Sequence, residues 1–333
     1  MKHVAPAVCL ACLLLFASTY AFGQGFSQPQ PRCCVCNQIL FGDYLTIDGR
    51  YYHRDHFLCE YCKKPIRDTY LQADHKYYHA VCYEQHVMVV CAICKRAIGS
   101  DDKQDEWGNC YHARHFSEYK QCDFCGRLIF GGFAAGQRHF PDGRDLCGMC
   151  AATSVTTVAA AETLMVRAGR YLAADDIHVG LRGISVLLLS RDKMQTFKRG
   201  REGVVKGLTD FASFTDSHGR SEDSGANIYL LNGMPEMEML ATLAHELMHV
   251  WQDTHNPLDQ DEALREGSAN YAAYLVMKRV GTKESEFVIT KMMKDTSPVY
   301  GDGFRRIRQY GDKHGVKGVI AVIASDHPKL TDD

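Results

Sequence analysis

The chain has 333 residues, and its formal net charge is only −2 at pH 7 because 38 basic side chains are offset by 40 acidic ones. The basic residues are scattered, so the charge pattern excludes the concentrated positive footprint of a nucleic-acid-binding protein. The length suits two small modules followed by one larger domain. The fifteen cysteines and sixteen histidines indicate metal binding or disulfides.

The amino-terminal segment predicts export to the periplasm or secretion. Lys2 precedes an apolar run at 8–16, and the small residues at 21–23 resemble a signal-peptidase site. We therefore expect residues 1–23 to be a signal peptide. Its apolar run is too short to span a membrane, so no span is expected after cleavage. Residues 24–32, rich in Gln, Pro and Gly, are expected to be a disordered tail.

Residues 33–86 carry a strong metal-binding pattern. Ligand-type residues come in pairs separated by two positions, which is how one segment presents two ligands to a tetrahedral zinc. Two zinc ions are predicted, one bound by Cys33, Cys36, His53 and His56 and the other by Cys59, Cys62, His79 and Cys82. This spacing resembles a LIM domain.

The pattern repeats about 58 residues later and predicts a second LIM-like module at 91–150. Its expected ligands are Cys91, Cys94, His112 and His115, followed by Cys122, Cys125, Cys147 and Cys150. The last pair follows a longer gap, in which His139 is an alternative ligand. About four structural zinc ions are therefore expected in the two modules.

A disulfide framework is the alternative interpretation of these cysteines, because an exported protein can form disulfides. Disulfides do not require histidines at fixed distances from the cysteines, so the spacing favours zinc. Cys34 and Cys110 are left over. Cys34 could replace Cys33 as a ligand, and a Cys34–Cys110 disulfide stays open because geometry decides such pairings.

Four elements are expected before the next motif. Ala151–Tyr171 reads as a helix and Gly183–Ser190 as a buried strand. The polar stretch Arg191–Gly225 reads as a long loop or a mobile hairpin. Asn227–Leu231 reads as a strand, either at the edge of a cleft, where an extended substrate could add by main-chain hydrogen bonds, or in the interior of a sheet.

An HExxH motif lies in a helical apolar pattern. His245 and His249 are four residues apart and share one helix face, so both imidazoles can bind one zinc. Glu246 can then act as the base that takes a proton from a zinc-bound water as it attacks a peptide carbonyl. The face expected to pack consists of Leu240, Leu243, Ala244, Leu247 and Trp251. The motif predicts a zinc endopeptidase that cleaves protein substrates.

Two residues compete for the third protein ligand of this zinc. His255 would give a metzincin-like pattern, but Gln252 occupies the position where metzincins need a glycine for a tight turn. Glu266 would give the gluzincin arrangement, if a second helix starting near 259–262 returns it to the metal. Asn270, one turn after Glu266, could then orient a ligand. The sequence favours Glu266.

From Cys33 onward the chain resembles the plant organ-size-regulating, ubiquitin-activated LIM-domain zinc peptidases and their bacterial relatives. The resemblance rests on GLT at 207–209, LLNGMP at 230–235, HELMHVW at 245–251, REG at 265–267 and SPVYGDGF at 297–304. It implies an α+β fold, with two tandem LIM modules before a gluzincin-like metallopeptidase domain at 151–333 that has a small sheet and the HExxH helix.

The resemblance also implies functional residues and partners. His245, His249 and Glu266 would bind the catalytic zinc, with Glu246 as the base. The LIM region would bind ubiquitin-like or other protein partners. SPVYGDGF contains Tyr300, which could donate to a tetrahedral oxyanion or could serve a structural turn.

A LIM-domain interaction scaffold with an inactive peptidase-like domain is the alternative function. The intact HELMH and REG motifs favour the enzyme over this scaffold.

Overall fold

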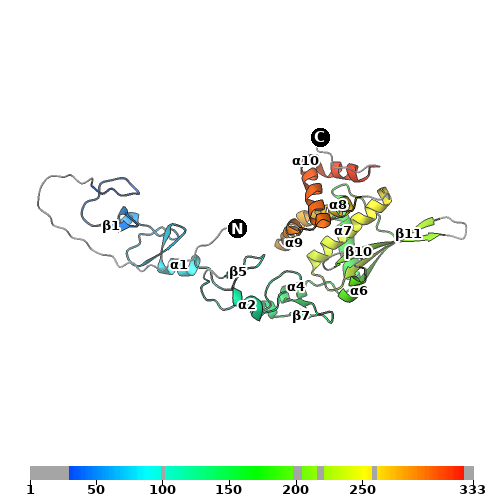
Figure 1. Ribbon diagram of the computed structural model, residues 1–333, viewed down its shortest axis with the longest axis horizontal. Coiled ribbons are helices and arrows are strands. Elements are labelled where there is room, and N and C mark those ends of the chain that lie inside the picture. The colour runs from blue at the N-terminus through cyan, green and yellow to red at the C-terminus, as the bar shows by residue number, and fades with distance from the viewer. Residues whose placement is uncertain (1–29, 99–101, 198–204, 216–220, 257–260, 326–333) are drawn as a thin grey trace. The chain divides into compact units, whose positions relative to one another are not determined.

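The computed structural model describes residues 30–98, 102–197, 205–215, 221–256 and 261–325, with backbone only at 212–215 and 221–224. Figure 1 shows the elements in chain order by colour. Contacts divide the chain into two units, the first running to Gln104 and including Gly108–Ser117, the second comprising Asp105–Trp107 and the chain from Glu118. This division runs through the expected second LIM-like module. The expected signal peptide lies outside the described residues.

The first unit is built from short antiparallel hairpins, each followed by a helical turn. The elements are β1 (Tyr44–Ile47), β2 (Arg50–His53), the 3-10 turn η1 (Arg54–His56), β3 (Tyr70–Ala73), β4 (Lys76–His79), α1 (Ala80–His86), β5 (Asp102–Gln104), β6 (Cys110–His112) and α2 (Ala113–Glu118). The second strand of each hairpin ends on a candidate ligand histidine, namely His53, His79 and His112. The helical turn that follows carries the next candidate ligand. Two residues separate the ligands of each pair because the first ligand ends a strand and the second lies in the turn after it.

The start of the first unit lies earlier than the expected boundary at Cys33. Arg32 forms a bridge with Ile39, and the backbone N–H of Leu40 donates to the carbonyl of Pro31 at 2.9 Å. Pro31 and Arg32, which we expected to belong to a disordered tail, are therefore paired with the first finger. Residues 24–29 of that expected tail lie outside the described residues.

The second unit begins with a zinc-finger-like segment and continues into a helical domain with one three-stranded sheet. The elements of the finger are α3 (Gly131–Ala134), β7 (Arg138–His139), β8 (Asp145–Leu146) and α4 (Gly148–Ala152). The domain contains α5 (Val158–Ala173), β9 (Ile184–Leu189), α6 (Arg191–Gln195), β10 (Gly207–Thr215), β11 (Ser221–Leu231), α7 (Glu236–His255), α8 (Glu262–Val280), α9 (Lys283–Lys294), the π-helical turn η2 (Pro298–Asp302) and α10 (Gly303–Ile323).

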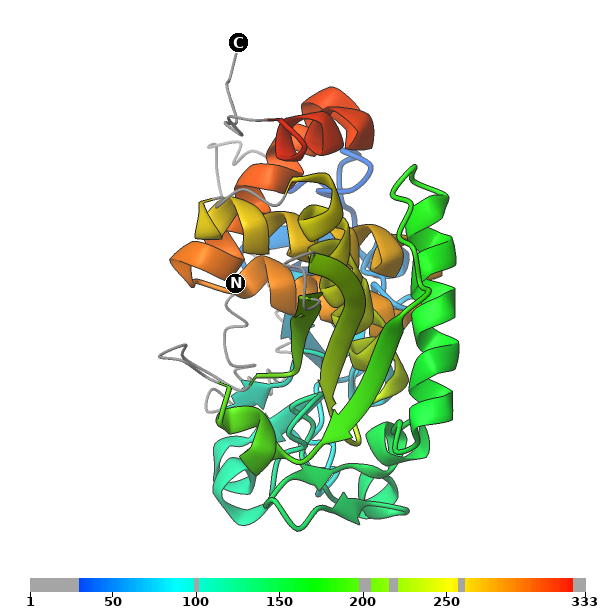
Figure 2. The ribbon, with the colours of Figure 1, turned by 90° about the vertical axis from the view of Figure 1, so that its right-hand side faces the viewer.

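The sheet has the order β10-β11-β9, so β11 is its central strand. β10 pairs antiparallel and β9 pairs parallel with β11. Figure 2 shows α5 running beside β9, while α7 contacts β10 and β11. One hydrophobic core joins the helices to the finger, since Phe124, Phe140 and Leu146 belong to the same buried cluster as Leu243 and Leu247.

The observed elements agree with the expected α+β class and correct several local predictions. The expected helix Ala151–Tyr171 is divided between α4 and α5. The strand predicted at Gly183–Ser190 is β9, but it is an edge strand in which only Val186 is buried, so the prediction of a buried strand was wrong. The hairpin alternative for Arg191–Gly225 holds, because β10 and the start of β11 fall in that stretch. Asn227–Leu231 lies in β11, which makes the interior alternative correct.

The beginning of α7 is fixed by a buried ion-pair network. Glu238, in the first turn of this helix, accepts from Lys206 at 2.6 Å and from Lys291 at 2.9 Å. Burial by itself raises the pKa of Glu238, but the two ammonium groups outweigh it and lower the pKa to about 2. Lys291 also donates to the carbonyl of Phe124 at 3.1 Å. The HExxH helix is thereby connected to β10, to α9 and to the zinc-finger-like segment.

The apolar face of α7 packs into the core of the second unit. Leu240, Leu243, Ala244, Leu247 and Trp251, the face of α7 expected to pack, are all buried. Within the described ranges, none of the helices combines the length and the apolarity needed to cross a membrane.

Candidate metal centres and active site

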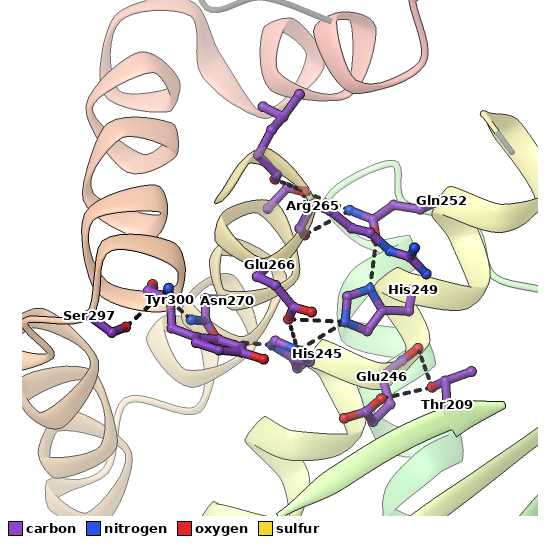
Figure 3. A network of polar contacts seen from close by, with 12 residues as sticks. Thr209, His245, Glu246, His249, Gln252, Arg265, Glu266, Asn270, Ser297 and Tyr300 are labelled. Carbon is purple, nitrogen blue, oxygen red and sulfur yellow. Dashed lines mark hydrogen bonds and ion pairs between the residues drawn. The ribbon is translucent and has the colours of Figure 1, made fainter. Parts of the chain in front are cut away.

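Three side chains from α7 and α8 converge on one point. His245 and His249 lie one turn apart on α7, and their Nε2 atoms are 3.1 Å apart. The Oε2 atom of Glu266, on α8, lies 3.2 Å from the Nε2 of His245 and 3.4 Å from that of His249 (Figure 3). Zinc bonds of about 2.0–2.1 Å in a tetrahedral arrangement place ligand atoms about 3.3 Å apart. The three donors therefore fit a zinc ion.

Close packing of α8 brings Glu266 to this position. A Cβ atom on Gly267 would lie 2.5 Å from the backbone carbon of Gly303, and one on Gly303 would lie 2.3 Å from the carbonyl oxygen of Ala263. Side chains at these two positions would separate α8 from the start of α10. The glycine of the REG motif thus permits a backbone contact next to the candidate ligand.

Asn270, which the sequence proposes as the residue that orients a ligand, contacts His245. The Oδ1 of Asn270 lies 2.9 Å from the Nδ1 of His245, and its Nδ2 donates to the backbone carbonyl of Tyr300 at 3.1 Å. A hydrogen bond at Nδ1 leaves the lone pair of Nε2 directed at the metal position. Tyr300 therefore contributes its backbone to the site, and Figure 3 shows its side chain extending toward His245.

Gln252 makes the corresponding hydrogen bond to His249, and this contact was not predicted from the sequence. Its Oε1 lies 2.8 Å from the Nδ1 of His249, and its Nε2 donates to Ser268 Oγ at 2.7 Å and to the carbonyl of Arg265 at 3.0 Å. The side chain is 2% exposed. The sequence feature that could have predicted this contact is the spacing: Gln252 follows His249 by three residues, which places both side chains on one helix face.

The charge of Glu266 suits a metal ligand. Burial raises the pKa of this carboxyl, but hydrogen bonds and charge from His245 and His249 outweigh burial and hold its pKa well below the usual range. Zinc binds the ionised form of a carboxyl group.

Glu246 lies beside this group without belonging to it. Its side chain is 3% exposed, and its Oε2 accepts from the hydroxyl of Thr209 at 2.8 Å (Figure 3). His255, the competing third ligand, is exposed and stacks on Trp251 with ring centroids 4.2 Å apart. It lies outside the group of ligand atoms formed by His245, His249 and Glu266.

Four further groups of ligand atoms coincide with the expected structural zinc sites. They are Cys33, Cys36, His53 and His56; Cys59, Cys62, His79 and Cys82; Cys91, Cys94, His112 and His115; and Cys122, Cys125, Cys147 and Cys150. The Sγ of Cys33 lies 3.4 Å from the Nδ1 of His56, and the Sγ atoms of Cys125 and Cys147 are 3.6 Å apart. Zinc–sulfur bonds of about 2.3 Å place neighbouring ligand atoms about 3.5–3.8 Å apart, so these groups could bind zinc as LIM modules do.

The CxxC segments share one backbone conformation. The residue after each pair has a positive φ, and its N–H donates to the carbonyl of the first cysteine; the four residues are Asn37, Lys63, Lys95 and Gly126. This tight turn directs both thiols to one side. Its presence in the fourth segment supports the repeat, although the later gap in that copy is irregular.

The alternative ligands and disulfides do not appear in the described structure. His139 is exposed, and its Nδ1 pairs with Asp145 at 2.9 Å, away from the fourth group. No disulfide is found among the described cysteines, so a bond between Cys34 and Cys110 is absent from the described residues. Cys34 is exposed and lies outside the first group.

Comparison with known proteins links the chain to plant LIM-domain proteins at low identity. No family model matches the chain. Protein DA1-related 2 of Arabidopsis thaliana is 22% identical over 95% of this chain and 72% of its own length. The LIM domain-containing protein HDR3 of Oryza sativa subsp. japonica is 24% identical, covering 92% and 75%. Protein DA1 of Arabidopsis thaliana is 24% identical, covering 86% and 66%. The resemblance to this plant group is supported, while a bacterial and exported origin stays a prediction.

Metal content distinguishes the two candidate third ligands. The five groups of ligand atoms predict five zinc ions per chain. Glu266→Ala should reduce the content to four, because two imidazoles alone bind zinc weakly. His255→Ala should retain five, because His255 lies outside the group. Mass spectrometry of metals in the purified full chain measures both. Loss of one zinc from His255→Ala with none lost from Glu266→Ala would contradict the assignment.

Proposed function

We propose that the protein is a zinc-dependent endopeptidase that hydrolyses peptide bonds in protein substrates. The observation that carries the proposal is a buried carboxylate, Glu246, beside a three-ligand group that fits zinc and leaves a fourth position for a reactant. Structural zinc sites have four protein ligands, whereas catalytic sites have three. This group is therefore of the catalytic type, unlike the four Cys and His groups.

The side chains of the site have separate roles in this proposal. His245, His249 and Glu266 would hold zinc, which when bound would supply a Lewis acid for the hydrolysis. Glu246 takes the proton of the attacking water and delivers it to the leaving amine. The phenol of Tyr300 donates to the oxygen that gains negative charge. Asn270 and Gln252 hold the two imidazoles in place.

In this proposal the substrate pairs with β10, rather than with the strand Asn227–Leu231 that was considered from the sequence. β10 is an edge strand, and Thr209 on it contacts Glu246 directly. An extended segment of a protein substrate could pair with an edge strand through main-chain hydrogen bonds. Such pairing would bring a peptide bond next to the base with little dependence on side chains, which suits an endopeptidase.

The LIM-like modules are proposed to bind protein partners, whether ubiquitin-like or other. Support comes from the similarity to LIM-domain proteins and from apolar side chains exposed on the first unit, such as Phe41 at 76% exposure. An apolar side chain this exposed could be covered by a protein partner. These modules would position substrates or regulate the site.

Replacement of the base tests the enzyme directly. Glu246→Gln keeps the size of the side chain and removes its ability to accept a proton. We expect hydrolysis of a labelled protein such as casein to fall roughly 10²- to 10⁴-fold, with five zinc ions retained. Glu262→Gln, an exposed carboxylate at the start of α8, is the matched control and should keep full activity.

The outcome also separates the enzyme from the alternative of a LIM-domain scaffold with an inactive peptidase-like domain. A scaffold would hydrolyse nothing in either form, and the variant would equal the wild type. An active wild type with an equally active Glu246→Gln variant would remove Glu246 from the mechanism.

Export is a separate part of the proposal and rests on the amino-terminal sequence. The basic residue Lys2, the apolar run 8–16 and the small residues 21–23 support it. Expression of the full chain in a bacterial host should yield a protein outside the cytoplasm that begins at Gln24, as measured by intact mass. A cytoplasmic protein that retains residues 1–23 would contradict export.

A further inference from the structure

The carboxylate of Glu246 is held by the edge strand β10, in addition to its own helix. The hydroxyl of Thr209 donates to Glu246 Oε2 at 2.8 Å and also lies 3.3 Å from the backbone oxygen of Glu246. A hydroxyl has one proton to donate, and the shorter contact to the charged oxygen is the stronger one. Thr209 therefore fixes one of the two carboxylate oxygens.

The other carboxylate oxygen lies against a glycine of the same strand. A Cβ atom on Gly207 would be 2.3 Å from Glu246 Oε1 and 2.5 Å from the Cγ2 of Thr242. Residues two apart in a strand point to the same face, so Gly207 and Thr209 both face α7. Glycine leaves the space that the carboxylate fills, and threonine supplies the hydrogen bond that retains it there.

Gly207 and Thr209 can hold the carboxylate of a buried base in position. Glu246 is 3% exposed, so hydrogen bonds from neighbouring groups replace most of the bulk solvent around its carboxylate. A glutamate side chain has three rotatable bonds, and a base must lie within hydrogen-bond reach of the proton it accepts. Thr209 is β-branched and therefore stiff at χ1, and it sits on a paired strand opposite Ile228. The donor is thus fixed more firmly than its acceptor.

We propose that Gly207 and Thr209 are positioning residues for Glu246: the missing side chain of Gly207 leaves room for one carboxylate oxygen, and Thr209 holds the other by a hydrogen bond. The inference rests on the proposed peptidase function. It assigns a chemical role to the GLT segment at 207–209, which lies 37 positions from the base and is brought to it by the contact between β10 and α7.

Paired variants of the zinc-loaded full chain test the proposal. Thr209→Val keeps the shape and removes the donor, Thr209→Ser keeps the donor, and Gly207→Ala fills the space of the carboxylate. We expect kcat on fluorescein-labelled casein to fall about 10²-fold in Thr209→Val and Gly207→Ala, since a displaced reacting group costs that order of rate. KM and zinc content should stay unchanged. Thr209→Ser should return to within about threefold of the wild type, since its hydroxyl is retained.

Thr242→Val is the matched control. The hydroxyl of Thr242 donates at 2.8 Å to the backbone oxygen of Glu238 and makes no contact with Glu246. Its loss should leave kcat within about twofold, as a helix backbone contact adds little. A purely structural role of Thr209 would lower the melting temperature and the zinc content together, without recovery by serine.

Crystal structures of the same zinc-loaded proteins provide a readout that does not depend on turnover. The carboxylate of Glu246 should lie against Thr209 in the wild type and in Thr209→Ser, and should rotate away in Thr209→Val and Gly207→Ala. A carboxylate that keeps the wild-type position in both of these variants would overturn the inference. If the wild type cleaves no casein, the proposed function fails, while the position of the carboxylate still decides the positioning role.

Discussion

The contact between α7 and α8 is the constraint on which the candidate active site depends. It places two imidazoles and a carboxylate, which are otherwise strongly hydrated, within 3.1–3.4 Å of one another in a largely buried position. Burying such groups is unfavourable unless each is paired. Asn270 and Gln252 satisfy the outer nitrogens of the histidines, and a metal would satisfy the inner ones. Helix packing, hydrogen bonding and metal binding are therefore coupled at this point.

The fourth zinc-finger-like segment belongs physically to the same unit. Lys291 connects the carbonyl of Phe124, in the CxxC turn, to Glu238 at the start of α7. Trp107 packs on Phe287 of α9 with ring centroids 4.4 Å apart, and its indole N–H donates to the carbonyl of Cys125. A shared core and these polar contacts make this segment a support of the HExxH helix. The first two fingers share a small core of their own, for which bound zinc would supply folding energy.

Local patterns made the ligand groups predictable. Pairs of ligands two residues apart follow from the CxxC turn and from the step between strand end and helix, and both are short-range features that a sequence displays. The face of α7 could be predicted from helical periodicity. Glu266 was favoured over His255 because Gln252 replaces a required glycine, and the structure places Glu266 in the group.

Long-range contacts were not accessible in this way. The hydrogen bond from Thr209 to Glu246 depends on how β10 docks against α7, and no periodicity encodes it. For the polar stretch 191–225 the sequence left a loop and a hairpin as alternatives, and only the pairing of β10 with β11 decides for the hairpin. Asn227–Leu231 was visible as a strand, but its central position follows only from the pairing with β9 and β10. The contact of Gln252 with His249 was not predicted, because Gln252 was considered only as the residue that replaces the glycine of the metzincin pattern.

The central claim is that His245, His249 and Glu266 together hold a zinc ion beside Glu246. An anomalous difference map at the zinc edge, from crystals of the full chain, tests it most directly. The account predicts five peaks, one of them equidistant from the two Nε2 atoms and the Glu266 carboxylate. Four peaks confined to the Cys and His groups, with none between α7 and α8, would contradict it.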